Sequence, residues 1–296
     1  MSSDCTVRVR FYVPPADLRP YFTTFYLTEI DVAQGNVTDS LHPEWANLRL
    51  IEGARPQATI GEQEPVCGVR TIFTGPTSTT VRFSTGTSRL WGVGLLPLGW
   101  ARFVGGQANM LADRLFDAET EPALAGFRPL AECLFGPEPD EAAELERIIA
   151  HFAARDVGEL PERERILSVH GALLDGDVAT VAEMAELARL PAHTVERVCR
   201  RHFGFPPRLL LRRQRFMRSL SQYMLDPTLD WIGAMDGHYH DQAQFVRDFH
   251  RFMGTSPREY AAQPHPVLAA VMRARQQVAG AAVQALHNPL AVMPET

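Results

Sequence analysis

The pattern of apolar and polar positions changes near the middle of the chain. Up to about residue 104, short alternating segments rich in β-branched residues (7–13, 79–83 and 90–96) are separated by Gly/Pro turns, which is typical of an antiparallel β barrel or sandwich. From residue 140 onward the apolar positions follow helical spacing, as in 141–154 and 162–174. We therefore predict an α+β protein with a β-rich N-terminal domain and an all-α C-terminal domain.

A repeat of 50 residues organises the helical part. The motif Arg197-x3-Arg201-x2-Gly204-x2-Pro207-Arg208 recurs as Arg247-x3-Arg251-x2-Gly254-x2-Pro257-Arg258. Each copy has an apolar stripe, a cationic opposite face and a glycine suited to a left-handed helix end. Shorter helices are predicted before each copy, at 179–190 and 229–237. This arrangement is a helix-turn-helix, whose second helix enters the major groove of DNA.

One long helix is predicted over residues 207–224, between the two units, with Leu210, Leu211, Gln214 and Met217 inward and the arginines outward. A rigid helix fixes the distance between the two recognition helices, and helices on one face of B-DNA must lie about 34 Å apart.

Charge is distributed unevenly along the chain. The formal net charge is −6, and all 29 cations are arginine, which excludes enzymes that need a Schiff-base or P-loop lysine. Residues 1–165 carry 15 Arg against 23 Asp+Glu, whereas residues 189–218 carry nine Arg and a single acid, Glu196. A run with a local net charge of +8 is usually a solvated face, but this one calls for an anionic partner.

The paired motifs, together with the segment Asp241-Gln242-Ala243-Gln244-Phe245-Val246-Arg247-Asp248-Phe249, resemble the DNA-binding domain of AraC-type transcriptional regulators. The N-terminal half is similar to the cupin-like sensor domain of one AraC-type subgroup. Its segment Gly92-Val93-Gly94-Leu95-Leu96-Pro97 stands where that subgroup usually has a strand of the pattern Val-Gly-Val-x-Phe-x-Pro. The resemblance implies a regulator that binds promoters through both units and senses a ligand or dimerises through its first domain.

Four segments are predicted: a β-rich cupin-like sensor domain at 1–137, linker or dimerisation helices at 138–174, a double helix-turn-helix domain at 175–262 and a helical extension at 263–296. The last segment lies beyond the usual end of the family. An amphipathic helix is predicted over 267–286, to cover the DNA-binding domain or to pair subunits.

In the first unit the resemblance assigns base reading to His193, Glu196 and Arg197. Arginine can bond guanine bidentately and glutamate can accept from cytosine. Thr194, Arg200 and Arg201 are assigned to phosphates, which position the protein without specifying sequence. The alternatives are a structural ion pair within the unit for Arg197 and Arg247, and an i,i+4 pair between Glu196 and Arg200.

In the second unit the equivalent base-reading positions are Gln242, Ala243, Val246 and Arg247. Glutamine suits adenine, and small apolar side chains suit the thymine methyl group. Phosphate contacts are assigned to Arg212, His250 and Arg251. Because residues 226–259 hold three Arg against six Asp+Glu, we expect the first unit to contribute more of the affinity.

An effector pocket is expected in the first domain. The candidate lining residues are Tyr26, Trp45, Arg49, Phe73 and Trp91, although strand aromatics also fill cores. Three alternatives remain: a constitutive DNA-binding or architectural protein whose first domain only dimerises, a cupin enzyme, and a DNA-repair regulator with a nucleophilic cysteine. A metal-dependent cupin needs several histidines, and residues 1–150 contain only His42.

The expected partners are double-stranded DNA, a small-molecule effector, RNA polymerase and a second copy of the chain. We expect no enzymatic activity, cofactor or metal. The absence of a signal-peptide or membrane-helix pattern predicts a cytoplasmic protein. The sequence leaves activation or repression open.

Overall fold

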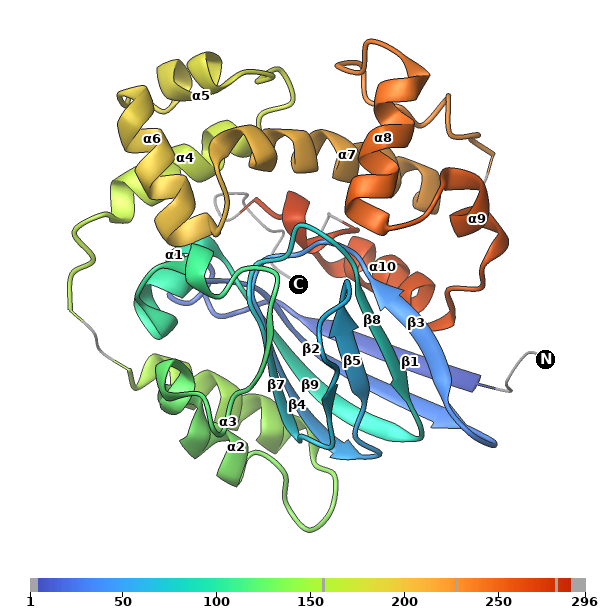
Figure 1. Cartoon of the computed structure of the whole chain (residues 1–296). Helices are drawn as coiled ribbons and strands as arrows, with labels where there is room; N and C mark the ends of the chain where they lie inside the picture. Colours follow the sequence, from blue (N-terminus) through green and yellow to red (C-terminus); the bar gives the residue numbers. More distant parts are fainter. Residues whose placement is uncertain (1–4, 156–157, 227, 280–281, 289–296) are drawn as a thin grey trace.

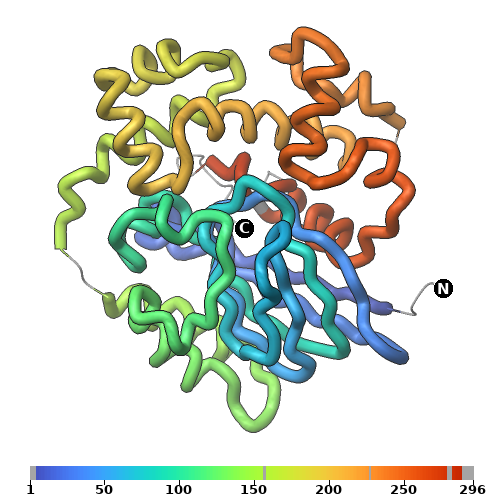
Figure 2. The backbone as a smooth tube through the Cα atoms, in the orientation of Figure 1, coloured from blue at the N-terminus to red at the C-terminus, as the bar shows by residue number. Residues whose placement is uncertain are grey.

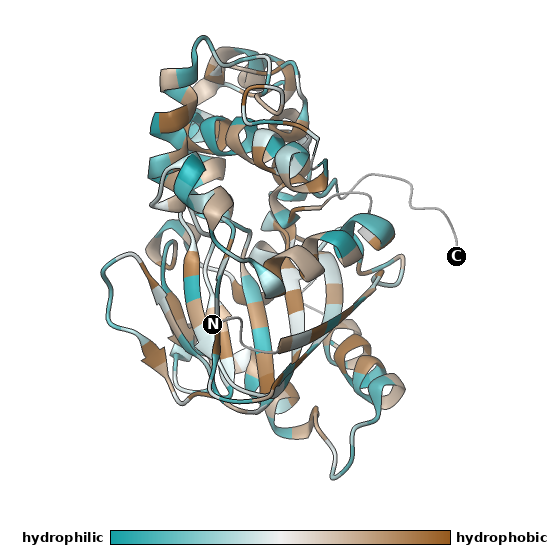
Figure 3. Cartoon of the chain, turned by 90° about the vertical axis from the view of Figure 1, so that its right-hand side faces the viewer, coloured by the Kyte–Doolittle hydropathy of each residue, from teal (hydrophilic) through white to brown (hydrophobic). Residues whose placement is uncertain are grey.

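The computed structural model describes residues 5–155, 158–226, 228–279 and 282–288. Strands form the N-terminal part and helices the C-terminal part, and Figure 1 shows the helices arranged across one end of the sheets. Figure 3 gives the side view, with the helical layer stacked on the strands. The predicted α+β class, with a β-rich N-terminal part and a helical C-terminal part, is confirmed.

Two antiparallel sheets build the N-terminal part. One has the strand order β1-β2-β9-β4-β7-β10 and the other β3-β8-β5-β6. The strands are β1 (Cys5–Tyr12), β2 (Phe22–Val32), β3 (Val37–Leu41), β4 (Asn47–Gly53), β5 (Gln57–Ile60), β6 (Val66–Cys67), β7 (Thr71–Thr74), β8 (Val81–Thr85), β9 (Ser88–Leu95) and β10 (Leu115–Asp117).

The outer face of the larger sheet packs against helices α2 (Arg128–Cys133) and α3 (Glu141–Ala153). Phe152 of α3 lies on Phe22 and Phe25 of β2, with ring centroids 4.6 and 6.4 Å apart. Buried Glu144 of α3 accepts a hydrogen bond from Trp91 Nε1 at 2.6 Å. The apolar face of α3, which the sequence suggested for dimerisation, is therefore used within the chain.

Four short helical turns join the strands to these helices: α1 (Pro97–Gly99), η1 (Trp100–Val104), η2 (Ala108–Met110) and η3 (Pro122–Phe127). The C-terminal part contains α4 (Arg163–Leu174), α5 (Val181–Leu187), α6 (Ala192–Val198), η4 (Cys199–Phe203), α7 (Pro207–Leu225), α8 (Gln242–Met253), α9 (Pro257–Ala262), α10 (Pro266–Ala279) and η5 (Gln284–Leu286).

The first helix-turn-helix unit shares a core with the loops next to the strands and with α1. Trp45, Leu96 and Leu98 of the N-terminal part are buried with apolar residues of α4, α5, α6 and α7. At their centre lies Arg213 of α7, which is fully buried; its guanidinium is 4.1 Å from the Trp45 ring centroid and donates to the Thr77 carbonyl oxygen at 2.8 Å. The prediction that the arginines of the long helix all face outward was wrong for Arg213, because a guanidinium can be buried against an aromatic face.

The second unit departs from the predicted helix pair. Residues 229–237 form turns instead of a helix. The side chain of Asp230 accepts a hydrogen bond from Gly233 N at 2.7 Å, and Asp236 accepts one from His238 N at 3.0 Å. Such side-chain acceptors and glycines compete with a continuous helical ladder in so short a segment.

The C-terminal extension lies between the sheets and the second unit, as the red segment in Figure 2 shows. Helix α10 contacts β1, β2 and β3. Leu268 and Met272 of α10 also join the core of the second unit. The predicted helix at 267–286 ends earlier, and it covers the open end of the sheets as well as part of the DNA-binding domain. Residues 289–296 of the predicted extension lie outside the described residues.

Candidate nucleic-acid interface and ligand pocket

The two recognition helices expose equivalent faces. Each residue of 191–203 is buried, half-buried or exposed in the same way as the residue 50 positions later, in 241–253. The apolar stripe is buried in each, and the outer face is open to solvent. The two copies of the sequence repeat therefore also present similar surfaces to solvent, and α7 connects them.

The ends of the recognition helices follow from local chemistry. Arg189 adopts a left-handed conformation (φ +54°) in the turn before α6, and Pro191 then begins that helix without a side-chain cap. Asp241 caps α8 by accepting from Gln244 N at 2.6 Å. Gly204 ends the first helix with φ +86°, and a Cβ there would lie 3.1 Å from Pro76 Cβ, so the end of this helix packs against a loop of the N-terminal part.

In the first unit, His193 and Arg197 are exposed and Glu196 is half-buried. The alternative i,i+4 pair is present, with Glu196 2.6 Å from Arg200. Arg197 also forms an ion pair, 2.7 Å from Glu162, but not within its own unit. The partner of Arg197 belongs to the N-terminal end of α4 and thus to the linker. The predicted base-reading arginine is held by a carboxylate outside its own unit.

Glu162 is the centre of a small charged cluster. It also lies 3.6 Å from Arg201 and 3.1 Å from His202 Nε2. Burial acts to raise the pKa of Glu162, but the hydrogen bonds and charges of Arg197 and His202 outweigh it and lower the pKa to about 2.

In the second unit, Gln242, Ala243 and Arg247 are exposed and Val246 is half-buried. Within the described residues Arg247 makes no ion pair or hydrogen bond, unlike Arg197. His250 and Arg251 are exposed one turn further along, and Thr194 of the first unit is half-buried.

A groove lined by arginines crosses α7 between the two units. Arg208, Arg212, Arg215 and Arg218 line it, together with Thr180 before α5 and Gln244 of α8. Fully buried Asp248 pairs with Arg212 and with Arg215, and Asp236 pairs with Arg218.

These contacts compensate only part of the local charge of +8, because Glu162, Asp236 and Asp248 are the partners that lie outside residues 189–218. The arginines of residues 189–218 that pair with carboxylates are Arg197, Arg200, Arg201, Arg212, Arg215 and Arg218. Asp248 was visible in the sequence motif, but its role as a buried acceptor for two arginines was not predicted.

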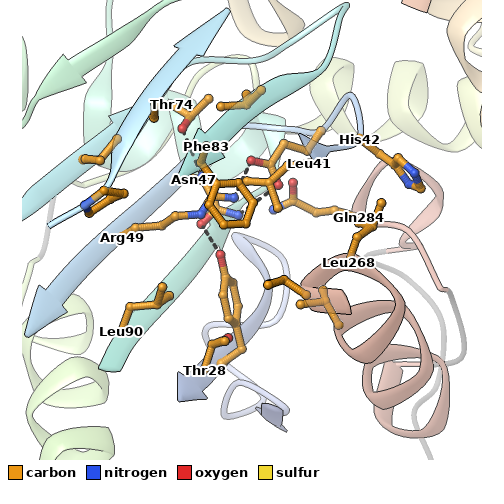
Figure 4. A pocket seen from close by; sticks show the side chains of 18 of the residues that line it. Thr28, Leu41, His42, Asn47, Arg49, Thr74, Phe83, Leu90, Leu268 and Gln284 are labelled. Atoms are coloured by element: carbon orange, nitrogen blue, oxygen red, sulfur yellow. Dashed lines mark hydrogen bonds and ion pairs between the residues drawn. The ribbon is translucent and has the colours of Figure 1, made fainter. Parts of the chain in front are cut away.

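An apolar pocket opens between the inner faces of the sheets and α10 (Figure 4). Of the five candidate lining residues, Tyr26 and Arg49 line this pocket, whereas Trp45, Phe73 and Trp91 lie elsewhere. Phe73 and Trp91 belong to the core between the larger sheet and α3, and Trp45 packs against the first unit.

The polar groups of the pocket form a connected cluster. Arg49 donates to Glu44 at 2.5 Å and to Thr74 Oγ1 at 3.0 Å, while the Tyr26 hydroxyl donates to Asn47 at 3.0 Å. Burial acts to lower the pKa of Arg49, but the charge of Glu44 outweighs it and raises the pKa. Burial raises the pKa of Tyr26.

His42 is engaged across the junction between the two parts. Its Nε2 lies 2.8 Å from the Tyr260 hydroxyl of α9, and burial lowers its pKa to about 3. Among the described residues, no group of three or more His, Cys, Asp or Glu side chains could hold a metal ion. In the same part of the chain no helix is long and apolar enough to cross a membrane.

A family model described as a helix-turn-helix domain matches residues 184–263. No curated protein sequence matches the chain.

Solved structures with a similar arrangement include ToxT from Vibrio cholerae O395, at 13% identity and a TM-score of 0.42, covering 86% of this chain and 96% of that one. ToxT from strain SCE256 with a bound unsaturated fatty acid has 10% identity and a TM-score of 0.39, covering 88% and 95% of the two chains. The AraC-like transcriptional activator CuxR has 12% identity and a TM-score of 0.25, covering 72% and 86%.

The fold and the two exposed recognition helices define a DNA-binding protein with a separate β-rich N-terminal part. The matched helix-turn-helix domain spans residues 184–263, which contain the paired motifs that resemble those of AraC-type regulators.

Proposed function

We propose that both units bind one face of duplex DNA and contact adjacent major grooves, and that a small molecule in the pocket regulates this binding. The observation that carries the proposal is the matching exposure of residues 191–203 and 241–253 on two helices joined by α7. A second unit without a DNA contact would have no need for an equivalent exposed face. Because the target is DNA, we place the action of the protein in the cytoplasm.

Each exposed position suits one kind of contact. Arg197 and Arg247 suit guanine, Gln242 suits adenine, and Ala243 and Val246 suit a thymine methyl group. His193 and Glu196 complete the base-reading set of the first unit. Phosphate contacts are proposed for Thr194, Arg200, Arg201, Arg212, His250 and Arg251, all of which are exposed or half-buried.

The pocket supports a regulatory function for the N-terminal part. It is mainly apolar, it contains a few buried polar groups, and it lies where the sheets meet the C-terminal helices. These are the usual properties of a small-molecule site. The only histidine in the lining, His42, is bonded to Tyr260, which favours binding over catalysis. Contact with RNA polymerase and pairing of two copies on DNA remain part of the proposal; a second copy needs a surface other than the apolar face of α3.

The test is selection of bound sequences from a random duplex library with the full-length protein, followed by affinity measurements at fixed salt. Arg247→Ala is expected to lower the affinity for the selected site and to relax the preference at one base, at a cost of about 1–3 kcal/mol. Arg258→Ala removes the same charge from an exposed position of α9 and serves as the matched control. Selection of no preferred sequence would overturn the proposal, as would equal losses of specificity in the two variants.

A further inference from the structure

The C-terminal extension supplies one wall of the pocket. Val267, Leu268, Val271 and Met272 of α10 face the inner sides of the strands, and Val283 and Gln284 follow after the helix. Opposite them lie apolar side chains of both sheets, including Phe11, Ile30, Ile51, Ile72 and Phe83. Figure 4 shows Leu268 across the cavity from Arg49 and Leu90. The site is thus composed of two parts of the chain that are separated by the whole helix-turn-helix domain.

The charged side chains of the lining do not balance. Glu44 is the acidic residue among them, and Arg49 and Arg275 are the cations; since burial keeps His42 neutral, one positive charge is in excess. Arg49 is paired with Glu44. The excess therefore belongs to Arg275 of α10.

Arg275 is only 4% exposed and has no carboxylate partner among the described residues. Its Nη1 donates to Thr24 Oγ1 at 2.9 Å, whereas Nε and Nη2 have no hydrogen-bond partner in the described part of the chain. Burial lowers the pKa of Arg275 to about 10, so it stays protonated at neutral pH. Nε and Nη2 form the edge of a guanidinium that binds a carboxylate through two parallel hydrogen bonds. A buried guanidinium whose Nε and Nη2 lack hydrogen-bond acceptors destabilises the folded protein unless an anion accepts those hydrogen bonds.

We propose that the pocket binds an apolar molecule with one carboxylate, that Arg275 is its charge partner, and that α10 is the lid of the site. The inference rests on the proposed function and names the ligand class of its pocket. Because Nε and Nη2 are shielded from solvent in this structure, the carboxylate reaches them only when α10 moves away from the sheets. The apolar part of the ligand then lies between the valines of α10 and the inner faces of the strands.

The lid is connected directly to the second unit. Asp39 of β3 accepts hydrogen bonds from Val267 N and Leu268 N, at 3.0 and 2.9 Å, and so caps α10 from the opposite wall. His265, just before α10, stacks on Tyr260 of α9 with ring centroids 4.2 Å apart, and Tyr260 packs on Phe249 of the recognition helix α8. A displacement of α10 therefore acts on the core that supports α8.

The experiment compares ligands of equal length and different head groups on the full-length protein. Octanoate, dodecanoate and hexadecanoate, a rigid aromatic acid such as naphthoate, and the corresponding alcohols are titrated by thermal shift and calorimetry. Wild type is expected to bind at least one acid at least about tenfold more tightly than its alcohol, and the acid is expected to change amide exchange in α10.

The decisive variant is Arg275→Met, which replaces the cation by an apolar side chain of similar length. It is expected to abolish the preference for the acid while leaving the unliganded protein as stable as wild type or more stable. Arg273→Met, at an exposed position of the same helix, is the matched control and keeps the preference. If Arg275→Met does not fold, Arg275→Gln is expected to show the same loss.

The proposal is overturned if no acid binds, if wild type binds acids and alcohols equally, or if both Arg275 variants keep the preference. DNA binding of the same preparations is measured separately. Intact sequence-specific DNA binding without acid binding refutes only the ligand class, whereas acid binding without DNA binding refutes only the proposed DNA-reading function.

Discussion

The Glu162 carboxylate lies 2.7 Å from the Arg197 guanidinium, so the linker holds an arginine that we expect to contact DNA. The Arg197 side chain is 47% exposed, which leaves it accessible, but its Nη2 group cannot bond a guanine while it stays with Glu162. DNA and Glu162 therefore compete for this side chain. The contact is absent from the second unit, where Arg247 has no ion pair within the described residues.

Glu162→Gln is expected to tighten DNA binding by the free energy of a partly exposed ion pair, about 1 kcal/mol or roughly fivefold. The glutamine keeps the shape of the side chain and removes its charge, so Arg197 and Arg201 become free for DNA. Fluorescence anisotropy with the selected duplex at constant salt measures the change.

Glu164→Gln is the matched control, because Glu164 lies in the first turn of α4, two residues after Glu162, is exposed and makes no ion pair among the described residues. It removes the same charge without releasing an arginine. Equal effects of the two substitutions would show that only the overall charge matters, and a weaker affinity of Glu162→Gln would contradict the competition.

Arg197→Ala and Arg247→Ala compare the two units. The charge of the two segments predicts the larger loss at position 197, but the pair with Glu162 offsets part of what Arg197 gains on DNA. We therefore expect the loss on Arg197→Ala to grow by about 1 kcal/mol in the Glu162→Gln background. Binding isotherms of the four proteins in this double-mutant cycle give the coupling. A larger loss at position 247 in both backgrounds would contradict the dominance of the first unit.

The sequence predicted the recognition helices because the signal is local. Within each helix, the apolar stripe and the glycine that ends the helix lie within about a dozen residues of each other. It did not predict the partner of Arg197, since that depends on where the linker helix α4 packs. The outward position assigned to Arg213 failed for a similar reason: its partner Trp45 lies in a distant loop, and only the packed junction brings them together.

The strand aromatics show another limit of the sequence. Successive residues of a strand point to opposite faces, and here both faces are buried, one against α3 and one against the pocket. Tyr26 and Ile72 therefore line the pocket, while their neighbours Phe25 and Phe73 enter the core. With apolar residues on both sides, the alternation that marks an inward face disappears. Which of two adjacent aromatics meets a ligand is then set by the stacking of layers and not by sequence.

Arg213→Met tests the junction between the β-rich part and the first unit. It removes the contact with Trp45 and leaves the Thr77 carbonyl oxygen without this donor, while its apolar side chain still fills part of the space. We expect a loss in the free energy of unfolding of about 1–3 kcal/mol, measured by urea denaturation.

Arg208→Met is the control on the same helix, since Arg208 is exposed and makes no ion pair among the described residues. It is expected to change the unfolding free energy by less than about 0.5 kcal/mol. An unchanged or raised stability of Arg213→Met would show that the buried guanidinium costs as much as its contacts contribute.

His170 gives the junction a dependence on pH. It is 1% exposed between the Trp45 and Phe203 rings, and burial, reinforced by the charge of Arg213, lowers its pKa to about 3. A histidine in the unfolded chain titrates at about pH 6.5. Between about pH 6.5 and the folded pKa of about 3, the unfolded chain therefore binds a proton at His170 and the folded chain does not. The free energy of unfolding must then fall as the pH falls below about 6.5, by up to about 1.4 kcal/mol per pH unit from this residue.

His170→Phe keeps an aromatic ring at this position and removes the titrating group. It is therefore expected to reduce the slope of the unfolding free energy against pH, between about pH 6.5 and pH 5, by close to the amount that corresponds to one bound proton. Urea denaturation at several pH values measures the slope, which is independent of any constant packing cost of the substitution. His240→Phe makes the same substitution at an exposed position and is the control for the change of residue type. An unaltered slope in His170→Phe would show that His170 takes up its proton in the folded protein and that the junction opens to admit water.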